Sequence, residues 1–218
     1  MKFGKTMLAL TLCVTLMCTA CSTAWISEAE QIVAALVPAA ANIVALVAML
    51  QGESVSANDL ETIQNAGSQA GADLQLLQSL IAAYQKAGAA AQPGILNQVQ
   101  AAIKGAQSTM NGLLPALHIK DAATQAKITA VVGIMLSEIQ SLAAIVPLVD
   151  PSASPGTRAM ALMQVKKQPP LTASEFVSSY NTTMTAKTGN AELDHATAGM
   201  RIHLHGQFAR WASAGLLK

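Results

Sequence analysis

Four stretches of this chain carry apolar residues at alternating steps of three and four, with polar residues between them. That spacing keeps one apolar seam along an α-helix, where it packs against partner helices. The connections near residues 51–55, 87–93 and 118–120 are short, so neighbouring helices should run antiparallel. We therefore expect an all-α fold: an antiparallel up-down-up-down four-helix bundle over residues 21–150, with an additional helical C-terminal segment.

The four seams predict which side chains are buried. They comprise Ile26, Ala29, Val33, Leu36, Ala40, Ile43, Val47 and Leu50; Leu60, Ile63, Gly67, Ala70, Leu74, Leu77, Ile81 and Tyr84; Leu96, Val99, Ile103, Ala106, Met110, Leu113 and Leu117; and Ile128, Val132, Met135, Ile139, Leu142, Val146 and Val149. Ser27 with Glu30 has the pattern of a capping box at the start of the first helix, and Asp121 is placed to cap the fourth. Pro147 and Pro151 are expected to end the fourth helix.

The composition agrees with helices that pack through aliphatic side chains. Aromatic residues make up only 3% of the chain, which argues against a β-sandwich or barrel, and charged residues make up 11%. The formal net charge is +1, so the chain lacks the basic surface that nucleic-acid binding requires.

The N-terminus has the pattern of an export signal. Lys2 and Lys5 precede the apolar stretch Met7–Met17, and small residues follow in Cys18-Thr19-Ala20-Cys21-Ser22. The apolar stretch is too short to span a membrane stably. We expect residues 1–20 to be a signal peptide.

The cysteine after Thr19-Ala20 resembles the lipobox of bacterial lipoproteins, although that family usually has Leu where Cys18 stands. The resemblance implies that Cys21 is lipidated, becomes the first mature residue and anchors the chain in the cell envelope. Ser22 resembles the signal for passage to an outer membrane, if the cell has one. The alternatives are ordinary cleavage after Ala20 or Ala24, or an uncleaved N-terminal anchor. Without residues 1–20, Cys21 is the only cysteine left, so no internal disulfide can form.

The C-terminal third divides into two parts. Residues 151–171 are rich in proline and are expected to form a linker or irregular strap. Residues 172–218 are expected to be helical: Thr172 with Glu175 predicts a short helix, and a break follows at Gly189-Asn190. Beyond residue 190 the pattern fits either a helix or a strand, and we favour a helix because no partner strand is evident.

Charge and aromatic content suggest that the C-terminal segment docks on the bundle. Residues 22–150 hold nine acidic and four basic residues, whereas residues 151–218 hold three acidic and seven basic ones. Four of the seven aromatic residues, Phe176, Tyr180, Phe208 and Trp211, lie in the C-terminal segment. The alternative is that the basic segment meets anionic lipid or another acidic surface.

A small group of residues near the C-terminus could ligate a metal such as zinc or nickel. The group consists of Glu192, Asp194, His195, His203 and His205. His203 and His205 share a face only in an extended segment, so we expect solvated polar residues here and no metal. His118 is expected to be a helix-end residue rather than a ligand.

The first predicted helix has a second interpretation. Ile32–Leu50 is long enough to cross a bilayer, and Asn42 is its only strongly polar residue. Pro38, the alanine content and the acidic flanks argue instead for a helix of the bundle.

Function is indicated only in outline. The motifs of serine hydrolases, zinc proteases, phosphate-binding loops and dinucleotide-binding folds are absent from the sequence, so we expect neither catalysis nor a cofactor. We expect a non-enzymatic cell-envelope lipoprotein, a structural or interaction module at the membrane surface with an unknown protein partner. One alternative is a carrier of lipid or a small apolar ligand, which needs an apolar cavity of several hundred Å³. A less favoured alternative is a metal-dependent activity at His195, His203 and His205.

Overall fold

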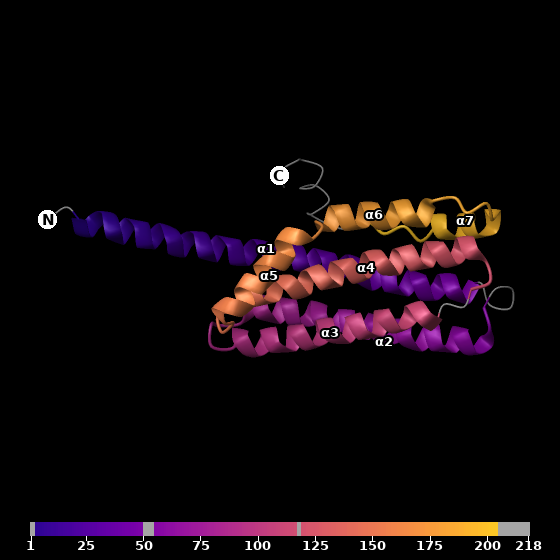
Figure 1. Ribbon diagram of the computed structural model, residues 1–218, viewed down its shortest axis with the longest axis horizontal. Coiled ribbons are helices and arrows are strands. Elements are labelled where there is room, and N and C mark those ends of the chain that lie inside the picture. The colour runs from indigo at the N-terminus through magenta and orange to yellow at the C-terminus, as the bar shows by residue number, and fades with distance from the viewer. Residues whose placement is uncertain (1–2, 50–54, 117–118, 205–218) are drawn as a thin grey trace.

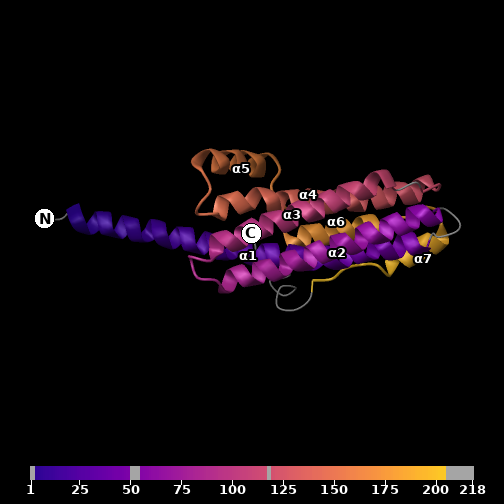
Figure 2. The same cartoon turned by 90° about the horizontal axis from the view of Figure 1, so that it is seen from below.

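The computed structural model describes residues 3–49, 55–116 and 119–204, and their side chains from residue 25 onward except at residue 116. Within these ranges the protein is all-α, as the sequence predicts, with seven helices (Figure 1). They are α1 (Phe3–Met49), α2 (Ala57–Lys86), α3 (Gln92–Ala116), α4 (Ala122–Val149), α5 (Pro155–Lys167), α6 (Ala173–Thr185) and α7 (Ala191–Ala198). The N-terminal part of α1 projects beyond the ends of the other helices (Figures 1 and 2).

The four long helices pack along the predicted seams. α2 contacts α1 and α3, and α4 contacts α3 and α1. Every predicted seam residue with a described side chain is buried except Val149, which is half-buried. Leu50 and Leu117 lie outside the described side chains. The heptad spacing therefore identified the core correctly.

Helix ends follow local sequence where a side chain can cap them. The Ser56 hydroxyl accepts a hydrogen bond of 3.1 Å from the backbone N–H of Asp59, and this bond starts α2. Asp121 accepts a 2.7 Å bond from the backbone N–H of Thr124 and starts α4, as predicted. Glu175 and Thr172 form the predicted capping box of α6.

One predicted helix start is wrong, and one predicted helix end is confirmed. Ser27 does not cap a helix, because α1 runs through it without interruption, and its hydroxyl instead accepts a bond from Gln31 one turn later. Pro147 lies in the last turn of α4, and the helix ends at Val149, just before Pro151, as predicted. A proline removes one N–H and can be tolerated near a helix end, where few further bonds are lost.

The predicted linker at residues 151–171 contains a helix, which corrects that expectation. Ser154 caps α5 through a 3.1 Å bond from the backbone N–H of Thr157, and Pro155 takes the first helical position. α5 packs on α4, and the Gln168 amide donates a 2.6 Å hydrogen bond to the hydroxyl of Ser137. Proline in this stretch therefore starts a helix.

The C-terminal segment folds back on the long helices. α6 packs against α4 and α1, with Phe176 and Tyr180 fully buried and their ring centroids 6.3 Å apart. The chain turns at Gly189, whose φ of +88° favours glycine, and then forms α7. Residues 201–204 are not helical, so the predicted helix over residues 191–217 ends at Ala198. Phe208 and Trp211 lie outside the described residues.

Two described helical stretches are long and apolar enough to cross a membrane by length and composition alone. Trp25–Met49 has a mean hydropathy of 2.4, and Ala122–Val149 has one of 1.8. About half of each is buried inside the protein, at 50% and 56%. Core helices of other proteins pass the same test.

Candidate functional site: a groove between α1, α2 and the C-terminal segment

A groove of about 500 Å³ opens between α1, α2 and residues 201–204, which we call the extended segment. Its lining combines apolar and polar side chains. They are Glu30, Gln31, Ala34, Ala35, Pro38 and Asn42 of α1, Gln78 of α2, and Arg201, Ile202, His203 and Leu204 of the extended segment. The chain returns alongside the long helices after α7 to form this wall (Figure 2).

Two asparagines hold the wall in place. The Asn181 amide donates a 2.8 Å bond to the carbonyl of Ile202, and its oxygen accepts a 2.9 Å bond from the backbone N–H of Ile202. This pair of bonds replaces those that a neighbouring strand would supply. Asn42 donates a further bond of 2.7 Å to the carbonyl of Met200. The segment can therefore remain extended without a partner strand, which explains why the predicted helix stops.

Ile202 is buried, whereas Arg201 and His203 are exposed along the groove. His205, the other member of the candidate histidine pair, lies outside the described residues.

The middle of the α1 wall is formed by small apolar residues. Ala34 and Pro38 are both exposed and line the groove. Pro38 lacks an N–H, so the carbonyl of Ala34 is left without its usual donor one turn later. This part of the wall therefore offers a small apolar surface between the polar side chains of Gln31 and Asn42.

The charged groups of the groove lie on both of its sides. Glu30 accepts a 3.0 Å bond from the amide of Gln85, which holds its carboxylate at the α1–α2 edge. Arg201 supplies a positive charge from the extended segment. An apolar middle with Arg201 on one side and Glu30 on the other suits an elongated amphiphile whose polar or anionic end lies near Arg201.

A second hollow, of about 350 Å³, lies farther along the contact of α1 with α2. Its lining is mostly small and includes Ala41, Gly67 and Gly71. The core, in contrast, is closely packed: the space between Trp25 and its neighbours measures about 10 Å³. Both of these larger hollows therefore lie at the surface, along α1 and α2.

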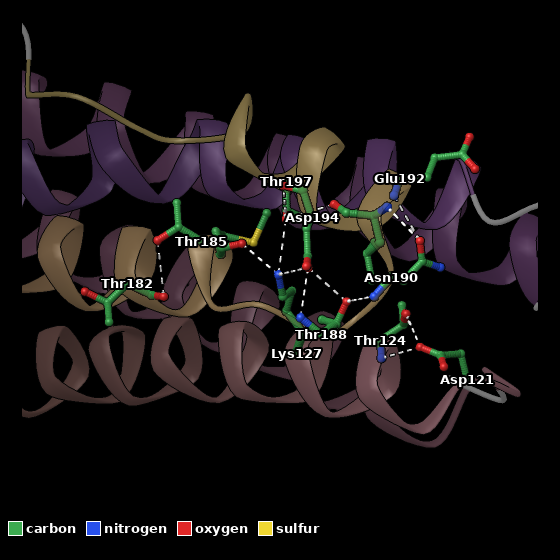
Figure 3. A network of polar contacts seen from close by, with 12 residues as sticks. Asp121, Thr124, Lys127, Thr182, Thr185, Thr188, Asn190, Glu192, Asp194 and Thr197 are labelled. Carbon is green, nitrogen blue, oxygen red and sulfur yellow. Dashed lines mark hydrogen bonds and ion pairs between the residues drawn. The ribbon is translucent and has the colours of Figure 1, made fainter.

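A buried lysine joins α4 to the C-terminal segment (Figure 3). The Nζ of Lys127 donates bonds of 2.8 Å to the carbonyl of Met184 and 3.1 Å to the hydroxyl of Thr197. The carboxylate of Asp194 lies 4.0 Å away and itself accepts two 2.9 Å bonds from Thr188. Burial lowers the pKa of Lys127, and the charge of Asp194 partly offsets this shift.

This network accounts for part of the candidate metal cluster. Asp194 is held by Thr188 and Lys127, while Glu192 and His195 are exposed on α7. Within the described part of the chain, no three His, Cys, Asp or Glu side chains are grouped to hold a metal ion. The side chain of Cys21 and the whole of His118 lie outside what the structure describes.

Glu138 of α4 is a second buried charge. Its side chain is 0% exposed, and neither carboxylate oxygen has a hydrogen-bond partner of ordinary geometry among the described residues. Burial raises the pKa of Glu138 to about 7; the backbone N–H of Leu171 opposes this rise, and the carboxylates of Glu28 and Glu175 add to it. Glu138 therefore holds a proton at mildly acidic pH.

The two buried charges match the polarity of α6. Eleven residues, about three turns, separate Lys127 from Glu138, so both lie on the face of α4 that α6 covers. Glu138 lies near the N-terminal end of α6, where Glu28 also accepts a 2.5 Å bond from the backbone N–H of Ala173. Lys127 binds the carbonyl of Met184 at the other end. Acids at the N-terminus of a helix and a base at its C-terminus both complement the helix dipole.

Sequence reasoning missed the burial of Lys127 and Glu138. A signal was present, since they are the only charged residues within the 28 residues of α4. An isolated charge in an apolar helix covered on two sides has to be buried or paired.

Comparison with known proteins adds no assignment: no protein-family model, no curated protein and no solved structure matches this chain.

Proposed function

We propose that this chain is a non-enzymatic cell-envelope lipoprotein, anchored through Cys21 and serving as a structural or interaction module at the membrane surface. The observation that carries the proposal is the lipobox-like sequence Thr19-Ala20-Cys21-Ser22 just before the packed body. Ile26 is the first buried apolar residue among the described side chains. Five residues of helix, about 7 Å, separate it from Cys21. A lipid at Cys21 would hold this end of the body close to a membrane.

We further propose that α1 to α4 form an antiparallel up-down-up-down bundle to which α5, α6 and α7 are added. The packing of α2 on α1 and α3, and of α4 on α3 and α1, supports this arrangement. Trp25 near the packed start of α1 stacks on Tyr84 near the end of α2, with ring centroids 6.3 Å apart. This contact is expected where two consecutive antiparallel helices meet at one end.

The anchor is tested by the intact mass of the protein extracted from membranes. We expect a mass above that of the Cys21–Lys218 polypeptide by a diacylglyceryl or triacylglyceryl group, because stable anchoring needs two or more chains. Cys21→Ser should abolish the added mass and release or misprocess the protein. Cys13→Ser is the matched control, because Cys13 would leave with the signal peptide. A mass equal to the bare polypeptide beginning at Cys21 or Trp25 would contradict the anchor.

A second candidate function is carriage of lipid or a small apolar ligand. The groove of about 500 Å³ favours it, because its volume falls in the range of small-molecule sites and the middle of its α1 wall is apolar. Ala34→Phe should fill the groove and displace a bound amphiphile. Ala101→Phe, on the exposed face of α3, should not. Native mass spectrometry of the membrane-extracted protein gives the readout, and loss of an amphiphile in Ala34→Phe alone would support carriage over a purely structural role.

A further inference from the structure

α5 presents its large apolar side chains to solvent instead of to the protein. Met160, Leu162 and Met163 are 68%, 47% and 72% exposed, and they are three of the five exposed large apolar residues in the described part of the chain. Only Ala161 of this helix is buried. A helix on a protein surface normally turns its larger apolar residues toward the core. The outward apolar side chains of α5 therefore indicate a surface that contacts an apolar environment outside the protein.

The same helix and its flanks are purely basic. Residues 151–171 contain Arg158, Lys166 and Lys167 and no acidic residue. Lys166 and Lys167 are exposed in the last turn, next to the outward methionines. Exposed apolar side chains followed by lysines suit contact with an anionic membrane surface, which attracts nearby basic residues.

α5 also lies near the packed start of α1, the end that an attachment at Cys21 would hold at a membrane. Trp25 of α1 shares a small core space with Ile145 and Val146, close to the end of α4. α5 begins a few residues beyond that end and packs back on α4. Both views place it at the end from which the N-terminal part of α1 projects (Figures 1 and 2).

We propose that α5 is a membrane-docking helix, whose Met160 and Met163 enter the headgroup region while Lys166 and Lys167 bind the phosphates of anionic lipids. Its orientation rests on the proposed attachment near Cys21. A second copy of the chain is a poorer occupant, because a symmetric contact would pair this basic, acid-free segment with its own copy. The docked helix would fix the orientation of the protein relative to the bilayer. A lipid anchor at one end of the chain cannot fix this orientation alone.

The test is amide hydrogen exchange of the full chain reconstituted in two kinds of vesicle, phosphatidylcholine alone and an equal mixture with phosphatidylglycerol. Exchange in residues 155–167 should slow on the anionic vesicles, while exchange in α7 should not change. Lys166→Gln/Lys167→Gln should lose about thirtyfold of this protection, since each lysine near an anionic surface contributes about 1 kcal/mol. Met160→Ser/Met163→Ser should lose protection as well. Met49→Ser/Leu76→Ser, which removes exposed apolar residues elsewhere, should keep it.

Equal exchange of α5 on both vesicles and in detergent would overturn the proposal. So would protection that appears without vesicles as the protein concentration rises, since a second copy would then cover α5. The mass measurement keeps the anchor separate. Protection of α5 in an unacylated chain would support the docking helix and refute the anchor. An acylated chain with an unprotected α5 would support the anchor and refute the docking helix.

Discussion

The side-chain amide of Asn42 in α1 donates a 2.9 Å hydrogen bond to the hydroxyl of Tyr180 in α6, across 138 residues of sequence. The other amide hydrogen is donated to the carbonyl of Met200 over 2.7 Å. One polar residue in an otherwise apolar stretch of α1 thus positions both α6 and the chain that leads into the groove wall.

Asn42→Leu should destabilise the protein by about 2–4 kcal/mol, because it leaves the Tyr180 hydroxyl and the Met200 carbonyl without their donor in a mostly buried site. Chemical denaturation measures this loss, and limited proteolysis near residues 199–204 should become faster. Asn65→Leu on the exposed face of α2 is the matched control and should change stability by no more than about 0.5 kcal/mol. Equal effects at the two asparagines would mean that Asn42 does not hold the groove wall.

Gly67→Ala should destabilise the contact of α1 with α2, because a Cβ at residue 67 would lie 2.0 Å from the Cγ2 of Val44. Valine is stiff at χ1 and cannot easily turn away, so the expected cost is about 1–3 kcal/mol. Gly71→Ala, one turn later, meets nothing within 4 Å and should instead stabilise α2 by up to about 1 kcal/mol. Thermal unfolding of the two variants compares them directly.

A double variant makes the Gly67 test specific. Val44→Ala removes the clashing methyl group, so Gly67→Ala should cost much less in that background. If Gly67→Ala is equally destabilising in the wild-type and Val44→Ala backgrounds, the close approach of the helices at this point is not the cause.

The sequence predicted the interior of the long helices well and the surface of α4 poorly. Seams such as Leu60 to Tyr84 follow from a spacing that only a helix packed on one side satisfies. α4 is covered a second time, by α5 and α6, and heptad spacing contains no information about that second layer. The groove could not be predicted either. It depends on contacts of Asn42 and Asn181 with the segment that ends at residue 204, and these residues are far apart in sequence.

Capping residues also show where local sequence decides the structure and where it does not. Ser56, Asp121 and Thr172 cap helices because a hydroxyl or carboxylate satisfies free backbone N–H groups, and that signal is local. Ser27 has the same local pattern but does not cap α1, because helix-forming residues precede it and the helix does not begin there.

Lys127→Met should loosen the C-terminal segment from α4. The variant keeps the apolar stem but removes donors from the Met184 carbonyl and the Thr197 hydroxyl. The expected loss is about 1–3 kcal/mol in the free energy of unfolding. Lys104→Met, at an exposed position of α3, is the matched control and should be nearly neutral. Hydrogen exchange should increase in α6 and α7 of Lys127→Met and stay unchanged in α2; a uniform increase across the protein would contradict a local clamp.

Glu138→Gln should remove a pH dependence of stability. Burial raises the pKa of Glu138 to about 7 in the folded protein, from 4.5 when unfolded. Below pH 4.5 the carboxyl is protonated in both the folded and the unfolded protein. Between pH 4.5 and 7 only the folded protein keeps the proton. The free energy of unfolding of the wild type therefore falls as the pH rises toward 7. Glutamine imitates the protonated form. The variant should therefore be more stable than the wild type at pH 8, by up to about 3 kcal/mol, and close to it at pH 4.5.

Denaturant titrations of both proteins across this pH range measure the effect, and Glu61→Gln on the exposed side of α2 is the control, expected to leave the wild-type pH profile unchanged. Because Glu138 lies beside the start of α6, exchange of the first amides of α6 should also rise with pH in the wild type and not in Glu138→Gln. Wild-type and Glu138→Gln stability curves that run parallel from pH 4.5 to 8 would mean that Glu138 is ionised in the folded protein throughout. Its two buried oxygens would then need a cationic or hydrogen-bonding partner.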